Sequence, residues 1–186
     1  MSENILPQVI QDAKNKTLAQ FELKYTGWYL YGSPAAEDEN HINYKTDVIS
    51  DIELRKLVAQ SKNKNSKAIS MNGSPNVSEY FVYEIKKKPS NAFAGWISIG
   101  RAVNNDIVLR FPTVSKLHAR LEIETTTFGD PLGYHIIDNN STGRTVHNGN
   151  YLEPDQPAPL SIGDTVLFGS VQCIVIDATT LWNKLR

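Results

Sequence analysis

Short runs of alternating apolar and polar residues dominate the chain from residue 79 to residue 178. Residues 80–85 alternate strictly, and the runs WISIG, DIVLR, ARLEIE, YHIID, TVLFG and VQCIVID follow at intervals of about ten residues. Turn sequences separate them: KPSN, VNND, FGDPLG, DNNSTG, HNGN and SIGD. This spacing is typical of an antiparallel β-sandwich or barrel, so residues 79–178 are predicted to form a mainly β domain.

The residues before this domain have a different pattern, which predicts an α/β extension over 1–60. Apolar residues recur at near-helical spacing after Pro7, and an aromatic strand follows around Tyr25–Tyr31. A second helix is predicted over 51–60, because Ser50 and Glu53 form a capping-box pattern before an apolar stripe. The polar segment 61–78 is predicted to be a linker or loop. The last residues, 179–186, are predicted to form a short helical tail that docks Trp182 and Leu185.

Charge and cysteine content narrow the possible functions. The 19 Lys and Arg residues nearly cancel the 20 Asp and Glu residues, which gives no overall attraction to nucleic acid or to an anionic membrane. The single cysteine, Cys173, excludes a disulfide framework and is expected to be a small buried apolar residue. The first residues show no signal-peptide pattern, so we expect a cytoplasmic protein.

Three polar turns carry groups suited to an anion. Gly100-Arg101 ends one predicted strand, Ser115-Lys116-Leu117-His118 precedes another, and residues 140–145 hold Thr142, Gly143 and Arg144. Arginine and lysine side chains, hydroxyls and loop amides together match a dianionic phosphate. Spacing alone leaves open whether the three turns converge.

No catalytic or metal-binding pattern accompanies these turns. The sequence has no nucleophile elbow, P-loop, acid pair or cysteine–histidine cluster, and its histidines lack ligand spacing. Asp106, Asp138 and Asp164 are interpreted as turn residues. We therefore expect neither an enzyme nor a bound cofactor or metal.

Four ordered motifs of residues 97–169 resemble the forkhead-associated (FHA) domain family. They are ISIGRAVNNDIVL, TVSKLHARL, DNNSTGRTVHNGNYL and LSIGDTVLFG. The resemblance extends over about Glu79–Asp177 and implies a sandwich of about eleven strands whose loops bind phosphothreonine peptides. It implies that Arg101, Ser115 and Thr142 contact the phosphate, and that Gly100, His118, Asn148 and Gly149 support the binding loops.

The chain departs from the family pattern beside the motif serine and the motif threonine. Lys116 stands where the family often has asparagine, and Gly143-Arg144 stands where it usually has Asn-Gly. Gly143 has no side chain to bind a peptide backbone, whereas Lys116 and Arg144 add positive charge, either as solvated side chains or as ligand contacts. We therefore hypothesise a site that depends more on the phosphate than on the flanking residues.

Two functions follow as expectations. The first is a phosphothreonine-dependent interaction module in kinase-linked signalling, whose partner is a phosphothreonine protein such as a Ser/Thr kinase or its substrate. The second is a phosphate-independent scaffold that self-associates, for example through the aromatic segment Tyr25–Tyr31. Neither function involves nucleic acid or a membrane.

Overall fold

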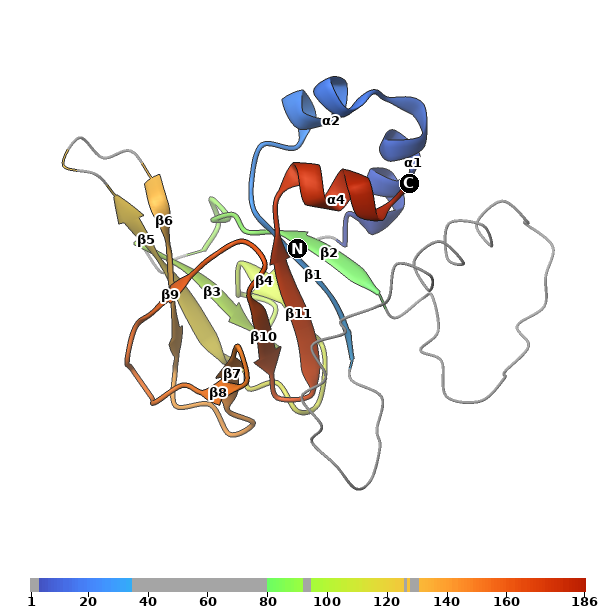
Figure 1. Cartoon of the computed structure of the whole chain (residues 1–186). Coiled ribbons are helices and arrows are strands. Elements are labelled where there is room, and N and C mark those ends of the chain that lie inside the picture. Colours follow the sequence, from blue (N-terminus) through green and yellow to red (C-terminus); the bar gives the residue numbers. More distant parts are fainter. Residues whose placement is uncertain (1–3, 35–79, 92–94, 126, 128–130) are drawn as a thin grey trace, which may run out of the picture.

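The computed structural model describes residues 4–34, 80–91, 95–125, 127 and 131–186 (Figure 1). These residues contain eleven strands and three helices. The helix predicted over 51–60 and the polar segment 61–78 lie outside the described residues.

The strands form two facing sheets, which confirms the predicted β-sandwich. In chain order they are β1 (Tyr29–Pro34), β2 (Phe81–Glu84), β3 (Trp96–Gly100), β4 (Ile107–Val108), β5 (Ala119–Thr125), β6 (Pro131–Asp138), β7 (Thr145–His147), β8 (Asn150–Tyr151), β9 (Ala158–Leu160), β10 (Thr165–Phe168) and β11 (Val171–Ile176). One sheet has the order β2-β1-β11-β10-β7-β8, and the other has the order β4-β3-β5-β6-β9. Neighbouring strands pair antiparallel, except for the short parallel pair β3–β4.

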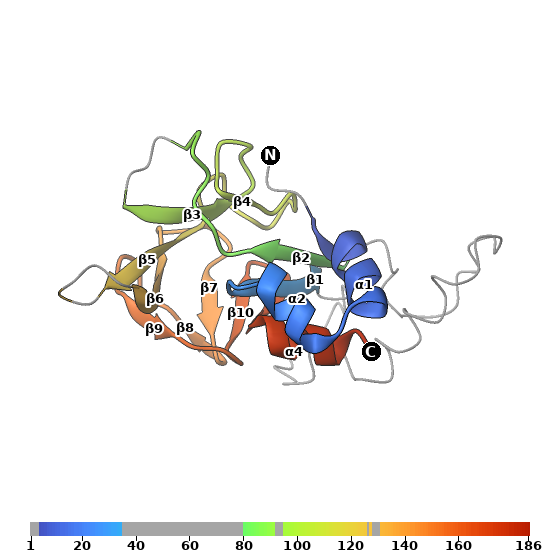
Figure 2. The same ribbon diagram turned by 90° about the horizontal axis from the view of Figure 1, so that it is seen from above.

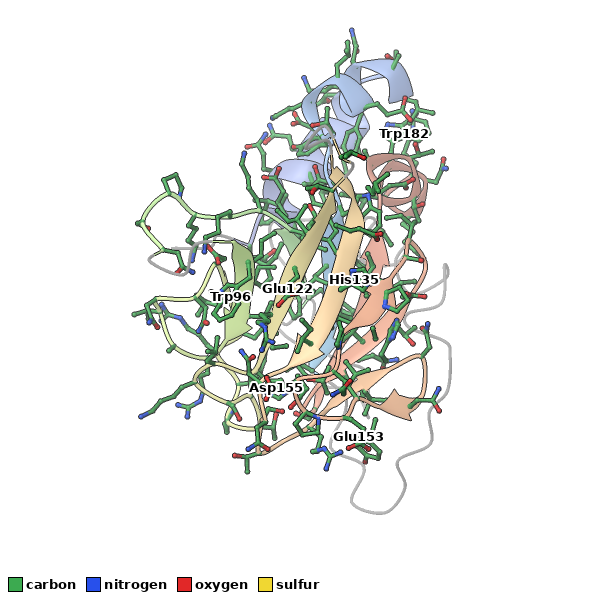
Figure 3. The ribbon with its side chains drawn as sticks, turned by 90° about the vertical axis from the view of Figure 1, so that its left-hand side faces the viewer. Trp96, Glu122, His135, Glu153, Asp155 and Trp182 are labelled. Atoms are coloured by element: carbon green, nitrogen blue, oxygen red, sulfur yellow. The ribbon has the colours of Figure 1, made fainter. Side chains whose placement is uncertain are left out.

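The space between the sheets is filled by alternate residues of the strands. Val171, Cys173 and Val175 of β11 all face it and are fully buried. This confirms the expectation for Cys173, and burial raises the pKa of its thiol, which keeps the thiol protonated and unreactive. The outer face of the five-stranded sheet carries Trp96, Glu122 and His135, which lie opposite one another across β3, β5 and β6 (Figure 3).

Three helices pack together on the outer face of the six-stranded sheet, over strands β2, β1 and β11 (Figures 1 and 2). They are α1 (Leu6–Asn15), α2 (Leu18–Lys24) and α4 (Ala178–Lys184). The apolar periodicity after Pro7 is divided between α1 and α2, because Thr17 and Gln20 form a capping box that starts a new helix. Helix α4 overlaps the tail predicted over 179–186, with Leu185 buried and Trp182 packed against the same core. No described helix is long and apolar enough to cross a membrane.

The aromatic strand predicted around Tyr25–Tyr31 is β1, and both of its faces are covered. Leu30 faces the inter-sheet core, whereas Tyr29 and Tyr31 face the helices, and all three are about 1% exposed. Residues 4–34 therefore pack onto the sandwich. The predicted domain boundaries at 60 and 79 lie outside the described residues and stay predictions.

Candidate functional site

Ser115 joins the three turns that the sequence marks as an anion site. Its carbonyl oxygen accepts a hydrogen bond from the Arg101 backbone N–H at 2.9 Å, and its hydroxyl oxygen accepts one from the Thr142 N–H at 3.0 Å. These bonds connect the turns after β3, before β5 and after β6, at the end of the sandwich that lies away from the helices (Figure 1). The structure thus brings together residues 101, 115 and 142, which are distant in the chain.

The hydroxyl groups at this junction keep donor capacity. Because the Ser115 oxygen accepts from Thr142, its own proton remains available to donate to an anion. Thr142 is exposed, and no described residue forms a hydrogen bond with its hydroxyl. Two hydroxyl donors therefore lie at the junction of the loops.

The Arg101 guanidinium is hydrogen-bonded through its Nε, and its two terminal nitrogens point to no acceptor among the described residues. Its Nε donates to the Val114 carbonyl oxygen at 3.0 Å, which fixes the stem of this exposed residue. Its terminal nitrogens have no hydrogen-bond partner among the described residues. A guanidinium group in this state can offer two parallel N–H donors to a phosphate.

The buried His118 side chain connects the second and third loops by hydrogen bonds. The Ser115 N–H donates to Nδ1 at 3.0 Å, so the ring proton is on Nε2, which faces the Arg144 carbonyl and the Ser141 hydroxyl, each at 3.1 Å. Burial lowers the pKa of His118, against the opposing effects of the Arg144 carbonyl and the Asp138 carboxylate. A neutral imidazole therefore links the second and third loops, as expected for a structural histidine.

Close backbone contacts explain two of the glycines. A Cβ atom added to Gly100 would lie 2.4 Å from the Lys116 carbonyl oxygen, and one added to Gly143 would lie 2.4 Å from the Thr113 carbonyl oxygen. Gly169 packs against the same Thr113 carbonyl from its own side. The loops therefore have no room for a side chain at position 143, where the family usually has asparagine.

We predict that Gly143→Asn destabilises the protein instead of restoring a family contact. The new side chain must displace the Thr113 carbonyl, and overpacking of this kind costs about 1–3 kcal/mol. Thermal unfolding followed by circular dichroism measures the loss. Gly133→Ala is the matched control, because a Cβ atom there meets nothing within 4 Å, and it should not lower the melting temperature. A Gly143→Asn variant as stable as the wild type would contradict the packing argument.

Lys116 and Arg144, the two cations that depart from the family pattern, both lie on the loops. Lys116 is exposed, and its carbonyl oxygen accepts from Ala102 N–H and from the Asn105 amide at 2.7 Å. Arg144 is also exposed, and its guanidinium lies over the Tyr151 ring, 5.4 Å from the ring centroid. The side chain of Arg144 therefore contacts β8, whereas its backbone belongs to the third loop.

Asn148 and Gly149 form the turn of the β7–β8 hairpin. Both have left-handed backbone conformations, with φ angles of 48° and 81°. The Asn148 side chain accepts from Thr165 N–H at 2.9 Å and donates to Asp164, which ties the hairpin to β10. The pair supports the strands that follow the third loop.

Sequence interpretation missed two buried carboxylates beneath the loops. Asp106 lies in the turn before β4, as predicted, and Asp138 is the last residue of β6, but neither position predicts that the two side chains are only 2% and 0% exposed. Asp138 accepts from Ser141 N–H at 2.8 Å and from the Ser141 and Thr145 hydroxyls, so it shapes the third loop. The dense local donors, Ser141 and Thr145 after Asp138, are the sequence signal that could have indicated this role.

The described residues contain no cluster of His, Cys, Asp and Glu side chains that could hold a metal ion. Fold and loops together define a class of protein: an antiparallel β-sandwich with an anion-suited site on the loops of one end.

Comparison with known proteins identifies the class more closely. Residues 97–169, from β3 to the end of β10, match the model of the FHA domain family. No curated protein matches the chain. The match to the family model shows that residues 97–169 form an FHA domain. Such a domain is generally a phosphothreonine-binding module in signalling and is not itself catalytic.

Several solved structures are similar to this chain. They include the MEK1 FHA domain in complex with the HOP1 pThr318 peptide, at 20% identity over 52% of this chain and 87% of that chain, with a TM-score of 0.41. Mycobacterium tuberculosis EmbR in complex with a low affinity phosphopeptide is 25% identical over 45% of this chain and 20% of that chain, with a TM-score of 0.37. The FHA domain of an Arabidopsis thaliana hypothetical protein is 27% identical over 55% of this chain and 77% of that chain, with a TM-score of 0.40.

Proposed function

We propose that the chain binds a phosphothreonine of a partner protein through Arg101, Ser115 and Thr142. The observation that carries the proposal is the position of Ser115, which hydrogen-bonds both other loops and keeps a proton to donate. Around it are the open end of the Arg101 guanidinium and the Thr142 hydroxyl. This set of donors suits the three oxygens and double charge of a phosphoryl group.

The same geometry supports a signalling role based on binding, and we propose that the whole chain acts in this way and not as an enzyme. Phosphorylation of the partner would supply the charge that engages Arg101, so a Ser/Thr kinase would control the interaction. A kinase or its substrate in the cytoplasm is the proposed partner. A site made of exposed and half-buried loop residues suits micromolar affinity, roughly −8 kcal/mol.

Calorimetry with matched peptides tests the proposal. The wild-type chain should bind a phosphothreonine peptide and should not bind the same peptide without phosphate. Because Gly143 gives no side chain to the peptide backbone, binding should depend on charge and should weaken as salt is raised. Equal affinity for both peptides would reject the proposal, and binding insensitive to salt would reject its ionic basis.

A phosphate-independent scaffold is the second candidate, and Gly143 is the observation that favours it. The predicted route of self-association through the aromatic segment is wrong, because Tyr25, Tyr29 and Tyr31 are at most 6% exposed and pack against this chain's own helices. Self-association through another surface stays a prediction. Recovery of the same partners before and after phosphatase treatment would favour the scaffold.

A further inference from the structure

Arg144 has an unusual backbone conformation for a residue with a side chain. Its φ angle of 60° lies in the left-handed region, which favours glycine. Its carbonyl oxygen accepts from His118 Nε2 and from Gly169 N–H, each at 3.1 Å. The loops therefore hold the Arg144 backbone at the edge of the proposed site, although glycine would adopt this conformation with less strain.

The Arg144 side chain is oriented by an aromatic ring but pairs with no carboxylate of the described residues. Its guanidinium lies over the ring of Tyr151, which is 51% exposed, at 5.4 Å from the ring centroid. No ion pair joins Arg144 to a carboxylate in the described part of the chain. Stacking on an aromatic face leaves the N–H edge of a guanidinium open to a carboxylate or phosphate.

The charges of the surrounding loops favour an anion. Residues 99–118 and 138–151 contain four cations, Arg101, Arg110, Lys116 and Arg144, and two carboxylates, Asp106 and Asp138, of which Asp138 is fully buried and bonded to Ser141 and Thr145. Asp106 is 2% exposed and is paired with Lys87 at 3.0 Å, so it presents no negative charge to a ligand. Of the next carboxylates along the chain, Glu153 and Asp155, Asp155 pairs with Arg120 at 3.1 Å.

We propose that Arg144, held over Tyr151, binds a second anionic group on the same partner segment, beside the phosphothreonine. This inference rests on the proposed function of the loops. It predicts that the domain selects its partner by charge. A phosphothreonine segment with uncharged flanking residues binds, and one with a neighbouring carboxylate or second phosphate binds more tightly.

Fluorescence anisotropy with a peptide set tests the inference. One phosphothreonine peptide has alanine at all flanking positions, two others carry aspartates on the N-terminal or the C-terminal side, and a fourth carries a second phosphothreonine. At low salt, at least one anionic peptide should bind about three- to tenfold more tightly than the alanine peptide. A preference for the aspartate peptides identifies a carboxylate as the ligand, and a preference for the doubly phosphorylated peptide alone identifies a phosphate.

Variants assign the preference to Arg144. Arg144→Gly, which relieves the left-handed strain and should fold, is expected to bring the affinity ratio of the anionic and alanine peptides close to one. Tyr151→Ala should reduce that ratio, because the guanidinium loses its platform. Arg186→Gly is the matched control: Arg186 also stacks on an aromatic ring, Trp182, but on α4, and its loss should leave the ratio unchanged.

The outcomes separate this inference from the proposed function. If the alanine peptide binds and no anionic peptide binds more tightly, the role of Arg144 is rejected and the phosphothreonine site stands. A preference that survives Arg144→Gly likewise rejects it. If no phosphothreonine peptide binds at all, the proposed function itself is rejected, and this inference with it.

Discussion

Arg101→Ala is expected to reduce the affinity for a phosphothreonine peptide by about a hundredfold or more without unfolding the protein. Each charge-assisted hydrogen bond contributes about 1.5–3 kcal/mol, and the two terminal nitrogens of Arg101 are charged donors without a partner among the described residues of the three turns. Arg101 is exposed, and in the described residues its side chain forms one hydrogen bond, to Val114. Isothermal calorimetry measures the loss, and an unchanged melting temperature, to within a few degrees, shows that the fold is intact.

Arg101→Lys distinguishes the shape of the group from its charge. Lysine keeps a positive charge but lacks the planar pair of donors and the Nε that holds the stem on Val114. We expect it to recover part of the lost affinity. Binding of the phosphothreonine peptide by Arg101→Ala at wild-type strength would show that the phosphate does not lie at this guanidinium.

The three turns that meet at Ser115 could be predicted because each is short and carries its own motif. Arg101, Ser115 and Thr142 come from three such turns, and the motifs indicated their order and their chemistry. Their meeting point could not be derived from spacing, because it depends on Ser115 using its carbonyl for one loop and its hydroxyl for another. The orientation of Arg144 toward Tyr151 is likewise a tertiary contact across a hairpin.

The sandwich could be predicted from period-two alternation, but the arrangement of the N-terminal residues could not. Tyr29, Leu30 and Tyr31 are all apolar or aromatic, and such a run fits a strand covered on both faces as well as an exposed aromatic segment. The deciding fact is that α1, α2 and α4 cover the second face of β1, which is a long-range contact. The sequence alone leaves the second face of this strand open to self-association, and the three helices close it.

The buried carboxylates were missed because aspartate in a turn has an ordinary local role. Sequence favours the local interpretation for an Asp beside Asn and Ser, since these residues usually cap turns at the surface. Asp106 instead accepts hydrogen bonds from Ser98, Lys88 and Asn91 and pairs with Lys87. It ties β3 and the segment after β2 to the loop that carries Arg101.

Asp106→Ala is therefore expected to destabilise the protein by about 3–5 kcal/mol, the largest stability change that we predict. The substitution removes one partner of a buried ion pair and leaves the Ser98 and Lys88 N–H donors, at 2.8 and 2.7 Å from the carboxylate, without an acceptor. Guanidinium-induced unfolding at neutral pH measures the loss. Glu84→Ala is the control, because Glu84 meets Lys86 at 4.0 Å at the surface, with side chains 41% and 71% exposed, and such pairs contribute about 1 kcal/mol or less.

Acid should abolish most of the difference between the wild type and Asp106→Ala. Burial acts to raise the pKa of Asp106, but the Ser98, Lys88 and Lys87 donors outweigh it and hold the pKa below its usual value. The ionised carboxylate thus stabilises the fold fully above the unfolded-state pKa of about 3.9, and this stabilisation is lost as the pH falls through the lower folded-state pKa. A gap in unfolding free energy that is small at neutral pH, or that widens in acid, would show that the charge of Asp106 does not hold the Arg101 loop in place.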